Sequence, residues 1–266
     1  MNNDLASVAV DVLQYALLWL ALYHLFQYLI SPYLLGRFST KYSQLTSSKQ
    51  TYWNASLVST SHAVLISAMA LRAAYYGKFW DTWPILDMNQ TTPLSHTTER
   101  VMNGYLFADA LLALYHRNSP AWTKTFYTVM GHHIVVFGIG MCICVLDFGH
   151  VYSMIGMLLE MTTPFVNLRW ILYTIQETKT TLYLINGLVL VLLWFLVRIV
   201  VAGPFAVYPL WVDKKERSLH VIITFVVTYT LIYPLQCFWF SKLLKGAYKA
   251  LSTGREESEG KKDKVS

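Results

Sequence analysis

The chain has 266 residues, of which 55% are hydrophobic and only 14% are charged, and its mean hydropathy is +0.39. A composition this apolar excludes an ordinary soluble domain, and the length excludes a single membrane hairpin, so the sequence predicts a polytopic membrane protein. The formal net charge of +6 lies mainly in connecting segments and at the C-terminal end. Membrane topology explains such a distribution better than nucleic-acid binding, so we expect no nucleic-acid partner.

Seven apolar stretches are candidates for membrane-spanning helices, each of which needs about 20 residues. In chain order they are 8–30, 53–76, 101–116, 125–146, 151–175, 182–202 and 219–244. The third is the shortest, because 78–100 is polar, contains Pro84 and Pro93, and is interpreted as a loop. Prolines also interrupt the fifth stretch, at Pro164, and the seventh, at Pro234. We expect an N-terminal helix and loop over 1–45, a main domain over 46–250 and a charged tail over 251–266.

Lysine and arginine residues orient these spans. Most of them fall in connecting segments on the same side of the membrane as the C-terminal tail, so the positive-inside rule predicts a cytosolic C-terminus. The basic 204–218 segment, which falls on the opposite side, argues mildly against this orientation. Asn89-Gln90-Thr91 is a glycosylation acceptor pattern on the side that this topology places outside the cytosol. The last five residues, 262–266, resemble a dilysine-type retrieval signal, which predicts residence in the endoplasmic reticulum. A solvated charged tail explains the same composition equally well.

Ionisable side chains inside the spans are the candidate functional residues. An ionisable group at membrane depth costs several kcal/mol, so its presence indicates a site or a polar cavity. At about 1.5 Å per helical residue, the residues of this group lie at similar depths in the cytosolic half of the membrane. They are His24, His62, Asp109, His132, His133 and Glu160. We expect them to converge on one polar chamber that opens toward the cytosol.

Helical spacing refines that expectation. His132 and His133 point about 100° apart, so they should play different roles. Asp109 and His116 are seven residues apart and share a face, as do Glu160 and Asn167.

Pro164 cannot donate a hydrogen bond to the carbonyl of Glu160, and Thr162 or Thr163 is expected to satisfy the freed backbone. For His24 and His62 the alternative role is an interhelical hydrogen bond. Arg198, near the end of the sixth span, is expected to extend toward the membrane surface. Adjacent histidines on one helix cannot easily bind one ion, so we expect no metal at His132, His133 and Glu160.

Five motifs together resemble the TLC domain family, which includes the ceramide synthases, and are most similar to its TLC domain-containing protein 4 subfamily. They are WNxxxVSTxHA at 53–63, GYLxxD at 104–109, MGHH at 130–133, LLExxxPFVNxRW at 158–170 and INGxxxxxxxxxVRI at 185–199. The resemblance implies an all-α integral membrane fold, with a six-helix barrel around a lipid-accommodating cavity and one additional helix. In ceramide synthases a histidine pair transfers a fatty acyl group from acyl-CoA to a sphingoid amine, and His132 and His133 match that pair.

The resemblance to ceramide synthases stops after the histidine pair. Where those enzymes continue with Thr, Ser-Tyr, His-Asp and Asp, this chain has Val136, Ile143-Cys144, Leu159-Glu160 and Thr163. Only Glu160 keeps an acid. A catalytic histidine needs an orienting acid, a role that Glu160 or Asp109 could fill.

Two functions therefore remain. The first is a lipid-binding membrane protein of lipid homeostasis, which regulates membrane lipid composition. The alternative is an acyl-CoA-dependent acyltransferase that resembles ceramide synthases, with acyl-CoA as co-substrate and no bound cofactor. The partners expected in both cases are membrane lipids: a sphingolipid, a fatty acyl chain or a phospholipid. The catalytic candidates are His132, His133, Glu160 and Asp109, and the substrate-binding candidates are His62, His116, Asn167 and Arg169.

Overall fold

The computed structural model describes residues 4–79, 81, 87–123, 126–203, 223 and 226–262, and every regular element in this part of the chain is a helix. The chain divides into two compact units, Met1–Glu177 and Thr178–Ser266. The predicted 204–218 loop, Pro84 and the last four residues of the retrieval-signal pattern lie outside the described residues.

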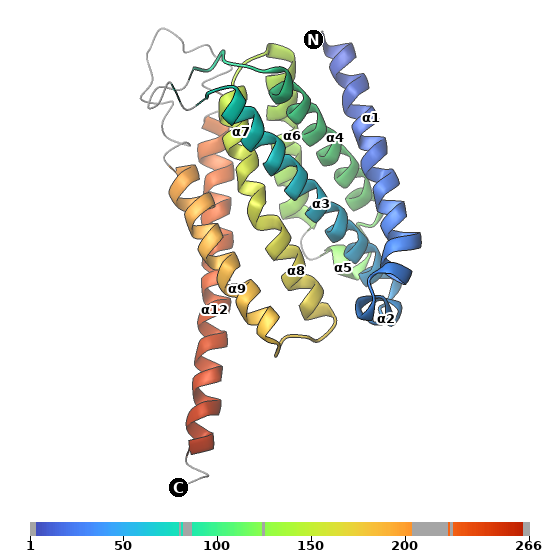
Figure 1. Cartoon of the computed structure of the whole chain (residues 1–266), viewed down its shortest axis with the longest axis vertical. Helices are drawn as coiled ribbons and strands as arrows, with labels where there is room; N and C mark the ends of the chain where they lie inside the picture. The colour runs from blue at the N-terminus through green and yellow to red at the C-terminus, as the bar shows by residue number, and fades with distance from the viewer. Residues whose placement is uncertain are drawn as a thin grey trace. The chain divides into compact units, whose positions relative to one another are not determined.

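The first unit is a bundle of long helices, shown in Figure 1. Its elements are α1 (Leu5–Leu25), η1 (Phe26–Leu34), α2 (Arg37–Ser43), α3 (Ser47–Tyr76), α4 (Pro93–Tyr115), α5 (Pro120–Thr123), α6 (Phe126–Leu146), α7 (His150–Leu158), η2 (Leu159–Thr162) and α8 (Thr163–Thr174). Helix α4 packs against α1, α3 and α6, while α3 also packs against α7 and α8. Consequently α3 and α4 form the centre of this unit.

The second unit pairs two long helical segments. Its described elements are α9 (Thr181–Leu193), η3 (Trp194–Val201), η6 (Thr228–Ile232) and α12 (Tyr233–Lys262). Helix α12 packs against α9 and η3. Arg198 donates a hydrogen bond from Nη1 to Oε1 of Gln236 at 2.8 Å and lies 4.4 Å from the ring centre of Trp194. The expectation that Arg198 extends toward the membrane surface is therefore wrong, because a buried amide and an indole face hold its guanidinium inside the unit.

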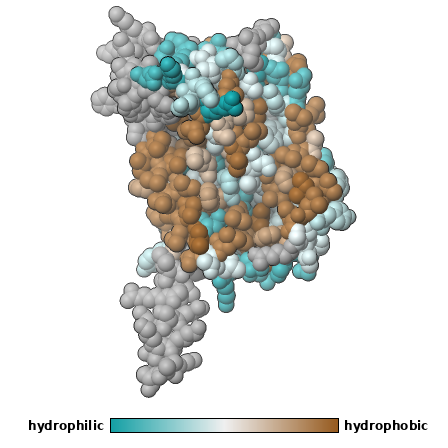
Figure 2. Space-filling model, in the orientation of Figure 1, coloured by the Kyte–Doolittle hydropathy of each residue, from teal (hydrophilic) through white to brown (hydrophobic). Residues whose placement is uncertain are grey.

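Four helical segments among the described residues are long and apolar enough to cross a membrane: Leu5–Leu34, Ser47–Tyr76, Phe126–Leu146 and Thr181–Val201. The distribution of polarity agrees with a membrane environment. Large apolar side chains such as Leu17, Leu71 and Leu192 are exposed, while Asn54 and Asn103 are fully buried. Figure 2 shows hydrophobic side chains over the middle of the first unit's helices and hydrophilic ones gathered near their ends. The chain is an all-helical membrane protein.

Two boundaries of the predicted spans are wrong at their N-terminal ends. Helix α3 begins at Ser47 rather than 53, and α4 begins at Pro93, inside the segment interpreted as a loop. Thr92 caps α4 with a capping box, in which its hydroxyl accepts from the Ser95 backbone N–H and Ser95 Oγ accepts from the Thr92 backbone N–H. Proline suits the first turn of a helix because its missing N–H would have no helical partner there. Pro93 therefore starts a 23-residue helix rather than marking a loop.

The break in the fifth predicted span lies just before Pro164. Helix α7 ends at Leu158, a 3₁₀ turn covers Leu159–Thr162, and α8 begins at Thr163. The proline ring excludes an ordinary helical turn around the carbonyl of Glu160, four residues back. The freed Glu160 carbonyl accepts instead from the backbone N–H of Thr163, while Thr162 Oγ1 donates to the Leu159 carbonyl at 3.1 Å. The expectation that a threonine side chain satisfies the Glu160 carbonyl is therefore wrong.

Candidate functional site

His133 and Asp109 form a direct pair between α6 and α4. His133 Nδ1 lies 3.1 Å from Asp109 Oδ2, and the two side chains are only 15% and 13% exposed. Asp109 therefore pairs with a histidine from another helix. His116, which shares its face of α4, lies about 10 Å farther along the axis. A short contact between an imidazole and a carboxylate, sheltered from solvent, fixes the ring orientation and favours one tautomer.

His62 of α3 lies beside this pair but makes a different kind of contact. Its ring stacks on Tyr105 of α4, with centroids 3.7 Å apart and planes 11° apart, and Trp19 of α1 meets it edge-on at 5.5 Å. Tyr105 is in turn 6.4 Å from the ring of His133. Neither ring nitrogen of His62 has a hydrogen-bond partner among the described residues. The expected interhelical hydrogen bond is thus replaced by aromatic stacking across the interface of α3 and α4.

Glu160 brings a second carboxylate to the same region from η2. Its Oε2 accepts a hydrogen bond from Thr163 Oγ1 at 2.7 Å, which holds the side chain at the helix break. Turn η2 packs against α3, the helix that carries His62. The Glu160 carboxylate lies within electrostatic range of His62, His133 and Tyr105. The 3₁₀ turn before Pro164 thereby places an acid near the stacked rings.

His132 occupies the neighbouring face of α6. Its ring centroid is 5.7 Å from that of His133, with an angle of 50° between the planes. His133 pairs with the acid of α4, whereas His132 is turned to a different direction. The two adjacent histidines thus have different surroundings, as the helical spacing predicts.

Two other substrate-binding candidates, Asn167 and Arg169, belong to α8. Asn167 of α8 donates from Nδ2 to the Ser56 carbonyl at 3.0 Å and to Thr60 Oγ1 at 3.1 Å, which ties α8 to α3. Arg169 is two residues farther along α8 and projects about 200° around the helix from Asn167.

His116 caps the end of α4. Its ring stacks on Trp122 at 5.3 Å, and its Nε2 is 3.5 Å from the Tyr23 hydroxyl. These contacts give His116 and Asn167 structural roles in joining helices.

The central group therefore consists of His62, Asp109, His133 and Glu160, together with Tyr105, which the sequence analysis did not select. Tyr105 of α4 is buried and lies between the two imidazoles, since its ring stacks on His62 and is 6.4 Å from the ring of His133. A signal was present in the sequence, because Tyr105 is four residues before Asp109 and so lies on the same face of the helix. The chain has 18 tyrosines, so a tyrosine in an apolar helix does not by itself indicate a site.

Chemically, the arrangement has an imidazole oriented by a carboxylate, which is the usual arrangement of a general base. It also has two carboxylates and an aromatic wall, which can hold a polar head group by hydrogen bonds and stacking. All these side chains belong to the first unit, so the group does not depend on the second unit.

Comparisons with known proteins place the whole region in one family. The TLC domain model matches residues 52–245. TLC domain-containing protein 4-B of Danio rerio is 27% identical over 240 residues, covering 86% of each chain. TLC domain-containing protein 4 of Homo sapiens is 25% identical over 244 residues, covering 88% of this chain and 89% of its own. TLC domain-containing protein 4 A of Dictyostelium discoideum is 25% identical over 236 residues, covering 87% and 88%.

Proposed function

Because the chain belongs to the TLC domain family, we propose that it is a multi-pass membrane protein of lipid homeostasis that binds a membrane lipid at the central group of α3, α4, α6 and η2. The observation that carries the proposal is the His133–Asp109 pair at 3.1 Å, with His62 and Glu160 beside it, inside a unit whose outer surface is apolar. Ionisable residues that converge at membrane depth are expensive, and they are retained where they bind something.

The proposed architecture has seven spans, of which six form a barrel around a lipid-accommodating cavity and one is additional. The protein resides in the endoplasmic reticulum with its C-terminus in the cytosol. Its partners are membrane lipids, a sphingolipid, a fatty acyl chain or a phospholipid, and not nucleic acid.

The chemistry of the central group defines the part of a lipid that it would take. Asp109 and Glu160 accept hydrogen bonds, so they suit an amine or hydroxyl head group, as in sphingoid bases and glycerolipids. His62 covers one face of Tyr105, so the aromatic surface proposed for the adjoining carbon chain or a cationic amine is the rest of Tyr105 together with Trp19, which meets it edge-on. A lipid that carries both features is therefore favoured over a purely apolar one.

Mass spectrometry of lipids bound to the detergent-purified full-length chain tests this proposal. The wild-type protein should retain one lipid class in excess over the bulk extract. Asp109→Asn and His133→Gln should each reduce that excess about 10- to 150-fold, since a lost hydrogen bond to a charged group costs about 1.5–3 kcal/mol. His24→Gln is the matched control, because His24 is exposed on α1 and lies outside the central group. Equal lipid content in all four proteins would refute the proposal.

A second candidate function, acyl-CoA-dependent acyl transfer, is favoured by the tautomer that the pair imposes. With Nδ1 directed at Asp109, Nε2 of His133 is the nitrogen that can take a proton. In this reaction His133 would accept the proton of a lipid amine or hydroxyl as that group attacks the thioester carbonyl carbon. The new C–N or C–O bond forms, the C–S bond breaks, and the CoA thiolate leaves and takes up the proton. His132 would then contact the acyl-CoA thioester from the neighbouring face.

Release of free CoA from a panel of acyl-CoA donors distinguishes the two functions. An acyltransferase should release CoA only when a lipid acceptor is present, and His132→Ala with His133→Ala should lower the rate about 10²–10⁴-fold, the usual contribution of a general base. Equal release by that double variant would rule out acyl transfer by this pair. Lipid retention without CoA release would leave lipid binding as the function.

A further inference from the structure

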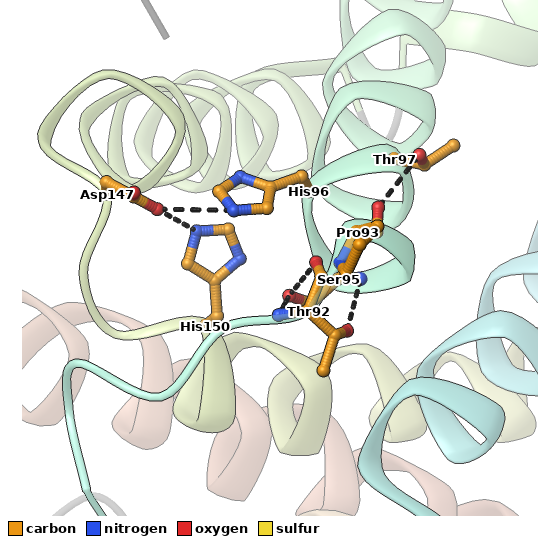
Figure 3. A network of polar contacts seen from close by, with 7 residues as sticks. All are labelled: Thr92, Pro93, Ser95, His96, Thr97, Asp147 and His150. Atoms are coloured by element: carbon orange, nitrogen blue, oxygen red, sulfur yellow. Dashed lines mark hydrogen bonds and ion pairs between the residues drawn. The ribbon is translucent and has the colours of Figure 1, made fainter. Parts of the chain in front are cut away.

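A second polar group lies at the other end of the same helices. His96 is in the first turn of α4, Asp147 directly follows α6, and His150 is the first residue of α7. Figure 3 shows the two imidazole rings turned toward the Asp147 carboxylate, with dashed contacts from both. His96 precedes Asp109 by 13 residues, which is about 20 Å along α4. This group is therefore separate from the proposed lipid site.

The spacing of the three side chains is that of metal ligands. Asp147 Oδ1 lies 3.4 Å from Nε2 of His96 and 3.4 Å from Nε2 of His150, and the ligand atoms of all three residues lie within 4.8 Å of one another. Around a tetrahedral Zn²⁺ with bonds of 2.0–2.2 Å, neighbouring ligand atoms are about 3.4 Å apart. Two edges of the triangle already match this spacing, and the third, between the two histidines, is no longer than 4.8 Å.

His150 provides an independent reason to expect a ligand. Its side chain is fully buried, yet neither ring nitrogen has a hydrogen-bond partner among the described residues. The 3.4 Å approach to Asp147 is close but lacks hydrogen-bond geometry. A buried polar atom without a partner costs about 1–3 kcal/mol, so such an atom needs an explanation. A metal ion bound at Nε2 would satisfy it.

The turn that carries Asp147 has a fixed backbone conformation. Asp147 and Gly149 both adopt positive φ angles, +53° and +77°, and the Gly149 N–H donates to the Met88 carbonyl at 2.7 Å. The turn between α6 and α7 is thereby held against the segment before α4. The Asp147 side chain is 44% exposed, which leaves a coordination position open to solvent. The nearby positive charge of Arg100 is offset by its ion pair with Asp11.

We propose that His96, Asp147 and His150 bind one divalent transition-metal ion of the Zn²⁺ class, which clamps the turn between α6 and α7 to the start of α4. Two imidazoles and one carboxylate suit Zn²⁺, whereas Mg²⁺ and Ca²⁺ prefer sites built from oxygen ligands. With three protein ligands, the fourth position is occupied by water.

The test uses the full-length protein in detergent, purified with a tag that contains no histidine and stripped with a chelator. Titration with ZnCl₂ should give one equivalent of bound metal, measured by elemental mass spectrometry after desalting. A Zn²⁺ concentration about 100-fold above Kd should raise Tm by roughly 5–10 °C. MgCl₂ at the same concentration should leave Tm unchanged.

Variants assign the bound metal to these residues. Asp147→Asn keeps a residue type that tolerates positive φ. It should bind Zn²⁺ at least about 100-fold more weakly, which exceeds the usual loss when a residue that only hydrogen-bonds to a ligand is changed. Asp81→Asn is the matched control, since Asp81 is an exposed acid outside the group, and it should bind like the wild type. Metal-free Asp147→Asn should keep the wild-type metal-free Tm, which shows that the variant folds.

Replacing both His132 and His133 by Gln should leave the amount of bound Zn²⁺ unchanged. Failure of the proposed lipid site and failure of the metal site can therefore be told apart. Absence of stoichiometric Zn²⁺ from the wild type would overturn the inference, and the three residues would then be an ion-paired cluster without metal. Equal Zn²⁺ affinity of the wild type and Asp147→Asn would also overturn it.

Discussion

At the scale of single residues, Gly140 determines how closely α6 approaches α4. A Cβ atom added at Gly140 would lie 2.6 Å from Oδ1 and 2.7 Å from Nδ2 of Asn103, whose side chain is fully buried. Asn103 Nδ2 donates to the Glu99 carbonyl at 2.9 Å, so moving the amide aside would break a buried hydrogen bond. Small residues at helix interfaces in membranes allow this kind of close approach.

Gly140→Ala should therefore destabilise the protein by about 1–2 kcal/mol, after a helix-propensity gain of up to about 1 kcal/mol is subtracted from the packing and hydrogen-bond losses. Gly138→Ala on the same helix is the control, because no atom lies within 4 Å of a Cβ added there. That control should be neutral or slightly stabilising. Thermal unfolding in detergent measures both. If the two variants had the same Tm, the close contact with Asn103 would have no energetic importance.

Individual residues also show what the sequence could predict about the sites. Depth along the spans, at about 1.5 Å per residue, predicted Asp109, His133, His62 and Glu160 at one level. It also predicted His24 and His132 there, but His24 is exposed and His132 does not pair with Asp109. It could not identify which acid pairs with which histidine, since that depends on the rotation of α4 relative to α6.

The second group escaped prediction for a different reason. Asp147 and His150 are three residues apart and could be read as a local pair, but His96 is 54 residues before His150. Only the packing of α4 beside the turn between α6 and α7 brings the third ligand to them.

At the scale of elements, helix ends were harder to predict than helix cores. The apolar run that begins at Val101 predicted a helix correctly, yet α4 begins eight residues earlier, with Thr92 and Ser95 as its capping box. The added turns are polar, but they are buried: Thr98, Glu99 and Arg100 all lie inside the unit. A hydropathy pattern cannot distinguish polar residues that face solvent from polar residues that face other helices.

The broken element, α7 to α8, shows where sequence reasoning was sufficient. A proline inside an apolar stretch predicts a break within the turn before it, and the structure has a 3₁₀ turn at Leu159–Thr162. The functional consequence was visible only in the structure. The break places the Glu160 carboxylate near His62 and His133, and Thr163 holds it there. The irregular turn is thus the element that supplies the second acid of the central group.

At the scale of the whole molecule, the two ends of the first unit differ in charge. Arg37, Lys41, Lys49 and Arg117 lie near one end, where α2 meets the start of α3 and α4 finishes. Asp4, Asp87 and Asp147 lie near the other end, as does the exposed Asn89 of the glycosylation acceptor pattern. By the positive-inside rule, the first end faces the cytosol. In that orientation the proposed metal group lies on the opposite, non-cytosolic side of the membrane.

Glycosylation mapping tests this orientation within the first unit. When the chain is expressed in cells, Asn89 should carry a glycan, because its acceptor pattern lies on the non-cytosolic side, and Asn89→Gln should abolish the corresponding mobility shift on a denaturing gel. The chain offers a matched control at the other end. Gln44 caps α2, is exposed and precedes Leu45 and Thr46, so Gln44→Asn creates an acceptor pattern by a single substitution. In the Asn89→Gln background this new acceptor should stay unmodified, since glycosyl transfer occurs only in the lumen. A glycan at position 44 with none at 89 would invert the orientation, and would place the proposed metal group in the cytosol.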